Sequence, residues 1–489
     1  MARAYLAIDL GAESGRVLHG TLDGGRLSLE DLHRFPNQPV RLPTGLYWDS
    51  LRLWHEILQG LANAARRGIA PSGIGVDTWG VDIALLGADG ALVDNPRHYR
   101  DARNAGMPER LFAEVPRDEV FGQTGIQIMP INSLYQWYAM QRAHSPALRA
   151  ARTLLFMPDL FNYFLTGVLR AETTIASTSQ FYNPATHGWA ASLLARLGLD
   201  PHLLPNLIPA GSRLGPLLPH VASQTGLDPA TPVFAAPGHD TAAAVAAVPA
   251  QTEDGWCYIS SGTWSLMGVE IPAPVINETT LAMNYTNEVG VGNRIRLLKN
   301  IAGLWVLQEC RRGWAAHGQD YSYEQLAHMA AGAAPFQAVI QPDAFLDPDS
   351  MPARIAGYCR RTNQPPVTAP GDVCRVILES LALRYRQVLE NLETITGRSI
   401  RVIHIVGGGS RNELLNQLAA DATGRTVIAG PAEATAAGNV LVQAMGDGAL
   451  SGLAQVRSVV RDSFEVRQFD PRPDPRWDEA YRAFLALPN

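Results

Sequence analysis

The chain has 489 residues, more than one ordinary hydrophobic core can organise, so its length predicts about two to four domains. Hydrophobic residues make up 46% of the chain and charged residues 18%, which indicates a well-folded protein. The formal net charge of −6, without a long basic run, argues against nucleic acid or an anionic membrane as the main partner. Small-molecule chemistry is therefore expected.

The N-terminus lacks the pattern of a signal peptide, because Asp9 and Gly11 interrupt the apolar run that such a peptide needs. No segment approaches about eighteen consecutive apolar residues, so we expect a cytoplasmic protein without a membrane span. The four cysteines include no Cys-x-x-Cys pair, and zinc is not expected. Cys359 and Cys374 flank a proline-rich loop and could approach each other, but free thiols are the expectation in a reducing compartment.

Residues 4–9 and 17–22 predict two short strands joined by a turn that contains two glycines. Such a turn can present backbone N–H groups to phosphate oxygens, with Ser14 and Arg16 adding side-chain donors. Asp9, at the end of the first strand, would then lie close to a metal that accompanies those phosphates. An ordinary hairpin with a polar tip explains this segment equally well.

A helix is predicted over residues 49–67, and an apolar strand that ends in a polar and aromatic cluster is predicted over 73–82. Trp79 in that cluster can be a stacking platform for a sugar ring or part of the core. The region 102–167 is expected to be mostly helical, after a polar patch at 100–103 that we interpret as a solvated helix start, with a substrate-facing Arg as the alternative. Residues 201–219 are predicted to form a loop because prolines punctuate them.

Near the middle of the chain, at residues 237–245, an apolar strand-like run stops and a small-residue helix-like run begins. Asp240 lies at this junction, where free backbone N–H groups and the helix dipole would hold a carboxylate ionised. Asp240 is therefore a candidate general base, with Gly238, His239 and Thr241 in the same turn. A plain helix cap is the alternative interpretation of Asp240.

The opening pattern returns after this junction, with strands predicted at 256–260 and 266–269 and a tight polar turn between them. Two such hairpins about half a chain apart predict two related domains that face each other across a cleft, each with a phosphate-contacting turn. The likeness is one of pattern rather than of residue identity.

The rest of the chain adds a helix beginning at Asn300, a proline-rich surface excursion over 342–371 and a long helix over 373–392. A strand at 402–406 then leads into a glycine turn and a helix, which is a nucleotide-binding geometry. The turn is neither a dinucleotide fingerprint nor a P-loop. The small-residue helix after Gly430 could pack under an adenine.

Six segments follow one another in a fixed order. They are Asp9-Leu10-Gly11-Ala12-Glu13-Ser14-Gly15-Arg16, Asp77-Thr78-Trp79-Gly80-Val81-Asp82, Gly238-His239-Asp240-Thr241, Ser260-Ser261-Gly262-Thr263-Trp264-Ser265-Leu266-Met267-Gly268, Lys299-Asn300-Ile301-Ala302-Gly303-Leu304-Trp305 and Val406-Gly407-Gly408-Gly409. Together they resemble the FGGY carbohydrate kinases over nearly the whole chain, although none is specific by itself. The resemblance implies an α/β protein of two actin-like, ribonuclease H-like domains, at 1–246 and 247–489, around a nucleotide and sugar cleft.

The resemblance also implies roles for individual residues. Asp240 would be the catalytic base, and Asp9 would lie at Mg²⁺. The ATP contacts would be Ala12, Glu13, Ser14, Gly15, Arg16, Thr263, Gln308 and Gly408. The sugar contacts would be Gly80, His239, Asp240, Thr241 and Asn300.

Glu13 departs from the family pattern, in which Ser is more usual at this position. Its charge should repel polyphosphate by about 1 kcal/mol or more at contact distance. We expect its side chain to point away from the phosphates, with a water-mediated contact to Mg²⁺ as the alternative.

The implied reaction transfers a phosphoryl group from ATP, with Mg²⁺, to a sugar. The segment 77–80 favours L-rhamnulose, phosphorylated at its 1-hydroxyl, over L-fuculose or another ketose. An actin-like or chaperone-like ATPase is the alternative of another class. The expected partners are the sugar and ATP, without nucleic acid or membrane, in a monomer or small homo-oligomer.

Overall fold

The computed structural model describes residues 2–346 and 350–488, and the chain divides into two compact units. Unit 1 comprises Met1–Pro249, Glu270–Leu297 and Ala434–Ser463. Unit 2 comprises Ala250–Val269, Leu298–Glu433 and Phe464–Asn489. The chain thus enters each unit more than once, and a division of the sequence between residues 246 and 247 stays a prediction.

Unit 1 is built on a six-stranded sheet with the order β13-β14-β6-β1-β2-β3. These strands are β1 (Arg3–Leu10), β2 (Ser14–Asp23), β3 (Arg26–Pro36), β6 (Gly73–Thr78), β13 (Arg213–Pro216) and β14 (Pro232–Phe234). Strand β1 is antiparallel to β2 and parallel to β6, which in turn is parallel to β14. The expected strand-turn-strand opening is therefore confirmed and forms the centre of the sheet.

Among the described residues, the other elements of unit 1 are thirteen α-helices, four short 3₁₀ helices and a set of short strands. The helices are α1 (Ser50–Arg66), α2 (Met107–Phe112), α3 (Arg117–Thr124), α4 (Ser133–Arg142), α5 (Pro146–Ala150), α6 (Met157–Thr166), α7 (Thr173–Ala176), α8 (Ala191–Arg196), α9 (Pro219–Thr225), α10 (Asp240–Ala246), α11 (Glu278–Ala282), α17 (Ala434–Gly446) and α18 (Leu453–Ser463). The short strands are β4 (Val40–Leu42), β5 (Gly45–Tyr47), β7 (Ile83–Leu86), β8 (Thr153–Phe156), β9 (Ala171–Glu172), β10 (Tyr182–Asn183), β11 (Gly188–Trp189), β12 (Leu207–Ile208) and β17 (Thr286–Val289).

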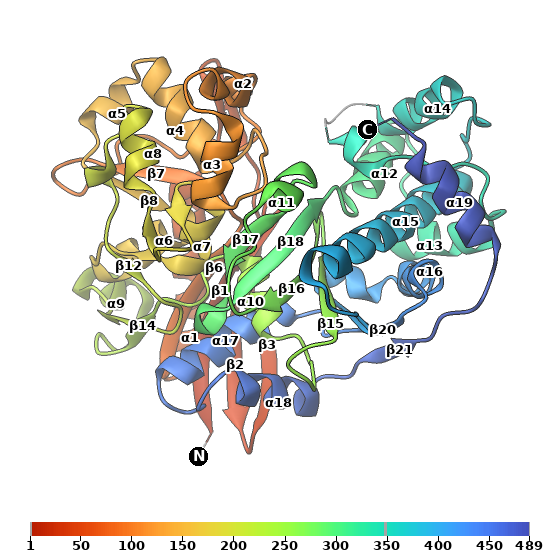
Figure 1. The fold of residues 1–489 in the computed structure, drawn as a ribbon. Coiled ribbons are helices and arrows are strands. Elements are labelled where there is room, and N and C mark those ends of the chain that lie inside the picture. The colour runs from red at the N-terminus through yellow and green to blue at the C-terminus, as the bar shows by residue number, and fades with distance from the viewer. Residues whose placement is uncertain (1, 347–349, 489) are drawn as a thin grey trace. The chain divides into compact units, whose positions relative to one another are not determined.

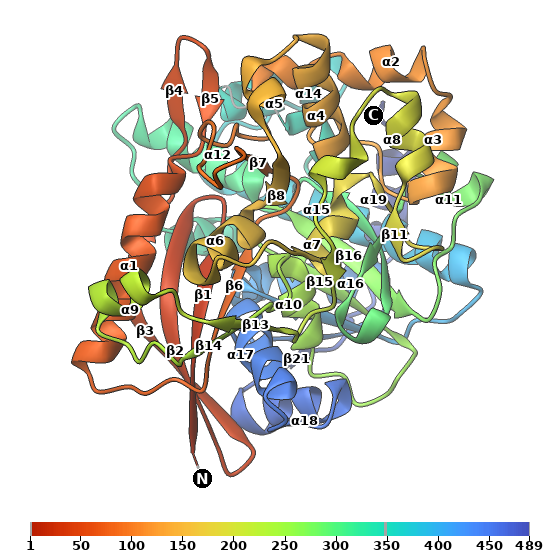
Figure 2. The same ribbon diagram turned by 90° about the vertical axis from the view of Figure 1, so that its left-hand side faces the viewer.

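Helix α1 shows why the local sequence folds as expected. The side chain of Asp49 accepts a hydrogen bond from the N–H of Arg52 at 3.1 Å and so caps the helix. Buried residues on one face, including Leu53, Ile57 and Leu61, pack against β2 and β3. Each such side chain contributes about 1.5–3 kcal/mol through removal from water. Figure 2 shows α9 beside α1.

Helix α17 comes from the far end of the chain and packs against β1, β6 and α10 of unit 1 (Figure 1). The approach is very close, because a Cβ at Gly438 would lie 1.8 Å from the carbonyl oxygen of Ala243 in α10. Asn439 donates to Asp77 at 2.6 Å, and Gln443 donates to the carbonyl of Leu6 at 3.0 Å. The small residues that raised the possibility of a contact with adenine are thus used in packing against α10.

Unit 2 contains most of a seven-stranded sheet with the order β17-β18-β16-β15-β19-β20-β21. Its strands besides β17 are β15 (Trp256–Ser261), β16 (Ser265–Ile271), β18 (Ile295–Ile301), β19 (Val402–Val406), β20 (Thr426–Ala429) and β21 (Arg467–Phe469). The helices are α12 (Trp305–Ala315), α13 (Tyr323–Gly332), α14 (Met351–Arg361), α15 (Pro370–Thr396), α16 (Glu413–Thr423) and α19 (Arg476–Leu485).

The two sheets repeat one topology. The order β3-β2-β1-β6-β14 in the first corresponds to β18-β16-β15-β19-β20 in the second. Strand β15 is antiparallel to β16 and parallel to β19, as β1 is to β2 and β6. The predicted second hairpin therefore occupies the place in its sheet that the first hairpin occupies in the other.

Two predicted elements of unit 2 are wrong. Asn300 belongs to β18 instead of starting a helix, because Gly303, at φ +47°, turns the chain before α12 begins at Trp305. The stretch 342–371 contains α14, where Ile355 and Cys359 are buried, and residues 347–349 of it lie outside the described residues. Pro342, Pro352 and Pro370 lie in the first turns of helices, where proline is well tolerated.

Two expectations for unit 1 also need correction. The proline-rich stretch 201–219 contains the edge strand β13, where a proline is tolerated because one side of the strand is unpaired. The patch at 100–103 is a helix start, because Asp101 caps a short 3₁₀ helix at Ala102–Asn104, but it is not solvated. Asp101 is buried and accepts a hydrogen bond from the N–H of Leu46 at 2.7 Å, and only 16% of the Arg103 side chain is exposed.

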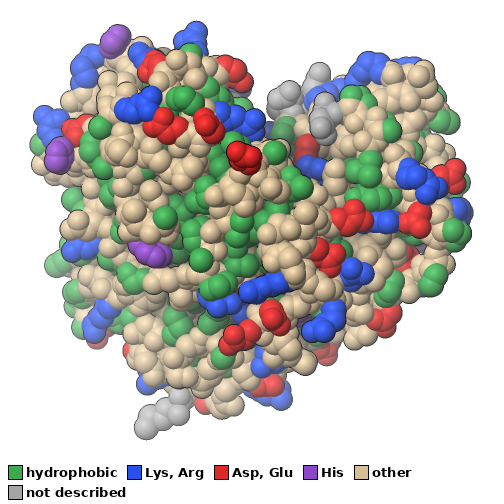
Figure 3. Space-filling model, in the orientation of Figure 1, with side chains coloured by type: hydrophobic (Ala, Val, Ile, Leu, Met, Phe, Trp, Pro, Cys, Tyr) green, Lys and Arg blue, Asp and Glu red, His purple; other side chains and the backbone are tan. Residues whose placement is uncertain are grey.

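The distribution of surface charge and the state of the cysteines agree with the expectations from the sequence. Lys and Arg side chains are interspersed with Asp and Glu on the face that Figure 3 shows. Within residues 2–346 and 350–488, none of the helices has the length and apolar character needed to span a membrane. All four cysteines are buried free thiols, as expected for Cys359 and Cys374.

Candidate active site

Two acids lie side by side in unit 1 near the carboxyl ends of the parallel strands β1 and β6. Asp9 and Asp77 are partners in the register of these strands. Asp9 Oδ2 accepts hydrogen bonds from Nε and Nη2 of Arg16 at 2.9 and 2.7 Å. Asp77 is fully buried, and its Oδ1 accepts no hydrogen bond within the described part of the chain. Burial, and then the charge of Asp9, raises the pKa of Asp77 well above its ordinary value.

The turn between β1 and β2 is held together by its main chain and by Asn37. The N–H of Gly11 donates to the carbonyl of Ser14 at 2.9 Å. Asn37 donates from its side chain to the carbonyl of Gly11 at 2.8 Å and from its N–H to that of Glu13 at 3.0 Å. Glu13 is exposed, and its role stays a prediction.

Asp240 is the first residue of α10, and His239 occupies the capping position. Asp240 Oδ1 accepts a hydrogen bond from the N–H of Thr241 at 2.6 Å. Removal from water raises the pKa of Asp240, His239 opposes this shift, and the charge of Asp9 adds to it. The Asp240 side chain nevertheless remains 32% exposed. An accessible carboxylate with a raised pKa is suited to act as a general base.

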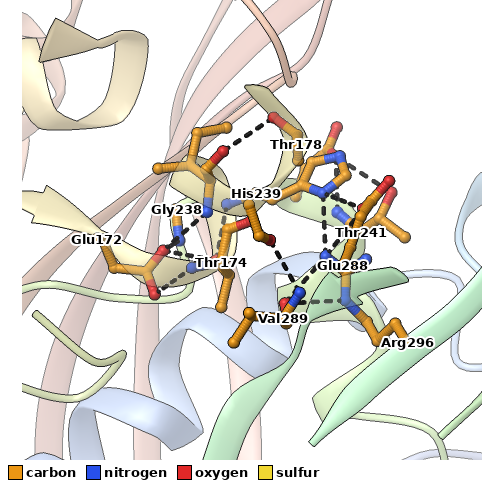
Figure 4. Close-up of polar contacts among 12 residues, drawn as sticks. Glu172, Thr174, Thr178, Gly238, His239, Thr241, Glu288, Val289 and Arg296 are labelled. Carbon is orange, nitrogen blue, oxygen red and sulfur yellow. Dashed lines mark hydrogen bonds and ion pairs between the residues drawn. The ribbon is translucent and has the colours of Figure 1, made fainter. Parts of the chain in front are cut away.

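A buried acid, Glu172 at the end of β9, fixes the turn that leads into α10. Its carboxylate accepts hydrogen bonds from the N–H groups of Gly238 and Thr174, both at 2.8 Å, and of Ile175 at 3.2 Å (Figure 4). The Thr174 hydroxyl donates to the same carboxylate and accepts from the N–H of His239 at 3.3 Å. A Cβ at Gly238 would lie 3.0 Å from Glu172 Oε2, so this close approach favours glycine.

The imidazole of His239 lies between Asp240 and Gly80. His239 Nε2 lies 3.4 Å from Asp240 Oδ1. A Cβ at Gly80 would lie 3.4 Å from His239 Nε2 and 3.6 Å from the hydroxyl of Thr178. The main chain at Gly80 therefore lies beside the imidazole of His239 and the hydroxyl of Thr178.

The structure places Trp79 in the core rather than at a surface for sugar stacking. Trp79 is 5% exposed, and its ring centroid lies 4.1 Å from that of Trp48. Both indole N–H groups donate to Asp82 Oδ2, and Gln136 donates to Asp82 Oδ1 at 2.9 Å. Burial raises the pKa of Asp82 to about 6, although these three donors oppose the shift.

Acidification should therefore change the tryptophan fluorescence of the protein with a midpoint near pH 6. Protonation of Asp82 removes charge from the oxygen that accepts from Trp48 and Trp79. Since the folded pKa of about 6 lies above the ordinary 3.8, the fold binds this proton more tightly than the unfolded chain does. Asp82 thus makes the free energy of unfolding fall as pH rises from 3.8 to about 6.

A fluorescence titration from pH 8 to pH 4 measures this transition, with Asp82→Asn as the variant that should lack it. Persistence of the pH 6 transition in Asp82→Asn would assign it to another group. A parent protein without any transition between pH 7 and pH 5 would contradict the expected pKa.

In unit 2 the turn between β15 and β16 carries Thr263. The N–H of Gly262 donates to the carbonyl of Trp264 at 2.8 Å, and the N–H groups of Leu304 and Trp305 donate to the carbonyls of Gly262 and Thr263 at 3.1 and 2.9 Å. The start of α12 thereby fixes this turn, as Asn37 fixes the first one.

The glycine turn after β19 packs against the same hairpin. Cβ atoms at Gly407 and Gly409 would lie 3.0 Å from the carbonyl oxygen and 2.0 Å from the hydroxyl of Ser261, respectively. A Cβ at Gly408 would have no neighbour within 4 Å. The outer glycines are therefore needed for packing, and Gly408 presents its backbone to open space.

The other candidates of unit 2 are Asn300 on β18 and Gln308 on α12. Oε1 of Gln308 is buried and has no hydrogen-bond partner among residues 2–346 and 350–488. Burial and the charge of Arg384 lower the pKa of Lys299, next to Asn300, to about 8, although Asp343 opposes the shift.

In the described part of the chain, no group of three or more His, Cys, Asp or Glu side chains is arranged to hold a metal ion. Magnesium that arrives with polyphosphate needs only one or two protein carboxylates and keeps several waters. Asp9, at the phosphate turn, offers such a carboxylate, and Oδ1 of Asp77, which has no hydrogen-bond partner among the described residues, is a second acid oxygen beside it. The donor chemistry therefore fits Mg²⁺.

Comparison with known families gives two matches. The description "FGGY family of carbohydrate kinases, N-terminal domain" matches residues 4–247, and the corresponding C-terminal domain matches residues 257–446. A rhamnulokinase from Bacteroides thetaiotaomicron is 47% identical over 486 residues, which cover 99% of this chain and 99% of the relative. A rhamnulokinase from Enterococcus faecalis is 40% identical, with 99% of this chain and 97% of the relative covered.

Solved structures share the fold at lower identity. A ligand-bound xylulose kinase from Lactobacillus acidophilus has a TM-score of 0.80 at 14% identity, covering 99% of this chain and 96% of its own. A xylulose kinase from Rhodospirillum rubrum has a TM-score of 0.77 at 21% identity, covering 99% and 98%. These likenesses confirm the expected two-domain, actin-like α/β fold.

Proposed function

The chain belongs to the FGGY family of carbohydrate kinases, and from this premise we propose that it phosphorylates L-rhamnulose at the 1-hydroxyl. The coarser activity, that of an ATP-dependent sugar kinase, follows from the family and its relatives. The sugar kinase activity rules out the alternative interpretation, an actin-like or chaperone-like ATPase. The rhamnulokinases at 37–47% identity support L-rhamnulose over L-fuculose.

The proposed mechanism rests on one observation, the accessible Asp240 carboxylate with a raised pKa at the start of α10. The proton of the 1-hydroxyl passes to Asp240 as the hydroxyl oxygen attacks the γ-phosphorus in line. The new O–P bond forms while the bond from the γ-phosphorus to the bridging oxygen of ADP breaks. Gly80, His239, Thr241 and Asn300 are the proposed sugar contacts.

Asp9 is the proposed ligand of Mg²⁺, which when bound neutralises charge on the phosphates. Arg16, paired with Asp9, places a further positive charge at the turn. The main chain at Ala12, Glu13, Ser14 and Gly15 offers N–H donors to phosphate oxygens. Thr263, Gln308 and Gly408 complete the proposed nucleotide contacts, a role for which the unpartnered Gln308 oxygen and the open backbone of Gly408 are suited.

A coupled assay of ADP release with a panel of L-rhamnulose, L-fuculose and D-xylulose tests the substrate. We expect kcat/KM to be at least about tenfold higher for L-rhamnulose, since one misplaced group costs about that much. A higher value for another ketose would overturn the proposed substrate. ATP turnover that does not depend on any sugar would contradict a sugar kinase altogether.

A further inference from the structure

The His239 side chain is held from behind by a buried ion pair. His239 Nδ1 lies 3.2 Å from Nη2 of Arg296 and 3.2 Å from Oε2 of Glu288. Figure 4 shows the two charged side chains on one side of the imidazole and Glu172 on the other side of the turn. Neither Glu288 nor Arg296 was singled out by the sequence.

The ion pair is rigid because both partners are buried and connected. Arg296 is completely buried, its Nε and Nη2 donate to the carbonyl of Val289 at 3.3 and 3.2 Å, and Nη2 lies 3.1 Å from Glu288 Oε2. Burial alone would raise the pKa of Glu288, but Arg296 and His239 hold it below its ordinary value. The carboxylate thus stays ionised and compensates the guanidinium.

Glu288 and Arg296 favour opposite protonation states of His239 Nδ1. A carboxylate requires Nδ1 to carry a hydrogen, whereas a guanidinium, which can only donate, requires a free lone pair there. Nη2 of Arg296 contacts His239 Nδ1 with the geometry of a hydrogen bond. Oε2 of Glu288 accepts no hydrogen bond from any of the described residues. The hydrogen of the neutral ring therefore belongs on Nε2, which faces Asp240 Oδ1 at 3.4 Å.

We propose that Arg296 and Glu288 are positioning residues that fix His239 as the Nε2–H tautomer. The inference rests on the proposed function, in which His239 contacts the sugar. The sugar then meets a fixed N–H donor at His239 beside a fixed acceptor at Asp240. A 1-hydroxy-2-ketone matches this pair, because its hydroxyl can donate to Asp240 while its neighbouring carbonyl oxygen accepts from His239.

Nitrogen-15 NMR of the full-length protein, labelled at its 12 histidines, measures the tautomer directly. The His239 signals are assigned by their loss in His239→Gln. In the ligand-free parent we expect Nε2 to be protonated and Nδ1 to be unprotonated. Nδ1 protonated and Nε2 free in the parent would overturn the inference, whichever sugar proves to be the substrate.

The double variant Glu288→Gln/Arg296→Gln removes the ion pair without leaving one buried charge alone. We expect its His239 to lose the single tautomer and the KM for the sugar to rise about tenfold, the worth of one hydrogen bond, while the KM for ATP stays unchanged. Retention of the parental tautomer and of the sugar KM would contradict the positioning role.

A second buried pair in unit 1, Glu270 and Arg457, supplies the matched control. Glu270→Gln/Arg457→Gln should keep the parental tautomer and sugar KM, which separates loss of an ion pair in general from loss of this one. An equal change in both double variants would also overturn the inference. If the tautomer is as expected but the ketose panel selects another sugar, the proposed substrate fails and the role of Arg296 stands.

Discussion

Replacement of Asp240 by Asn is expected to lower kcat by about 10²–10⁴-fold, the usual contribution of a positioned general base. The amide keeps the shape of the carboxyl group and can still accept from the N–H of Thr241, so α10 should be unchanged. It cannot take a proton from the sugar hydroxyl. Steady-state kinetics with saturating ATP and sugar measures the loss, and the KM for ATP should change little.

Asp23→Asn is the matched control, because Asp23 is exposed at the end of β2 in the same unit. It should keep parental kcat. Near-parental turnover in Asp240→Asn would mean that Asp240 only contributes to the start of α10, as the alternative interpretation of the sequence held.

Gly438→Ala is expected to destabilise the protein severely and to lower its activity as well. The added Cβ would lie 1.8 Å from the carbonyl oxygen of Ala243, a backbone atom that cannot rotate away. Helices α10 and α17 must then separate, and overpacking of this kind costs about 1–3 kcal/mol or more. Since α10 begins with Asp240, its displacement should also move the proposed base. Chemical denaturation and kcat on the same preparation measure both effects.

Gly122→Ala in α3 is the control for an alanine introduced into a helix. Gly122 has no atom within 4 Å of an added Cβ, so this variant should be unchanged or more stable by up to about 1 kcal/mol. Parental stability in Gly438→Ala would show that α17 can shift without cost and would contradict the close packing described above.

Much of the fold could be predicted because local patterns carry it. The apolar run in 4–9, the helix predicted over 49–67 and the change from strand to helix before Asp240 each lie within one short window of sequence. The failures occurred where a long-range contact overrode the local pattern. Asn300 joins β18 because its neighbours pair in a sheet, and Pro342, Pro352 and Pro370 lie in the first turns of helices instead of interrupting them.

The residues of the candidate site also fall into two groups: those that the local sequence marks, and those that reach the site only through folding. Asp9, His239 and Asp240 lie within two residues of a glycine and at predicted strand or helix ends, so the sequence alone could mark them. Glu172 and Arg296 could not be found, because their segments carry no such signal and they reach the turn before α10 only through folding. Asn439, which binds Asp77 from α17, is a further example.

The most direct measurement of the central claim, that Asp240 serves as the base in phosphoryl transfer to the sugar, is the rate of a single turnover. Rapid quenching of parent and Asp240→Asn, with enzyme in excess over ATP and L-rhamnulose at saturation, isolates sugar phosphate formation from product release. The rate should be about 10²–10⁴-fold lower in Asp240→Asn, with an unchanged dissociation constant for ATP. Equal single-turnover rates in the two proteins would contradict it.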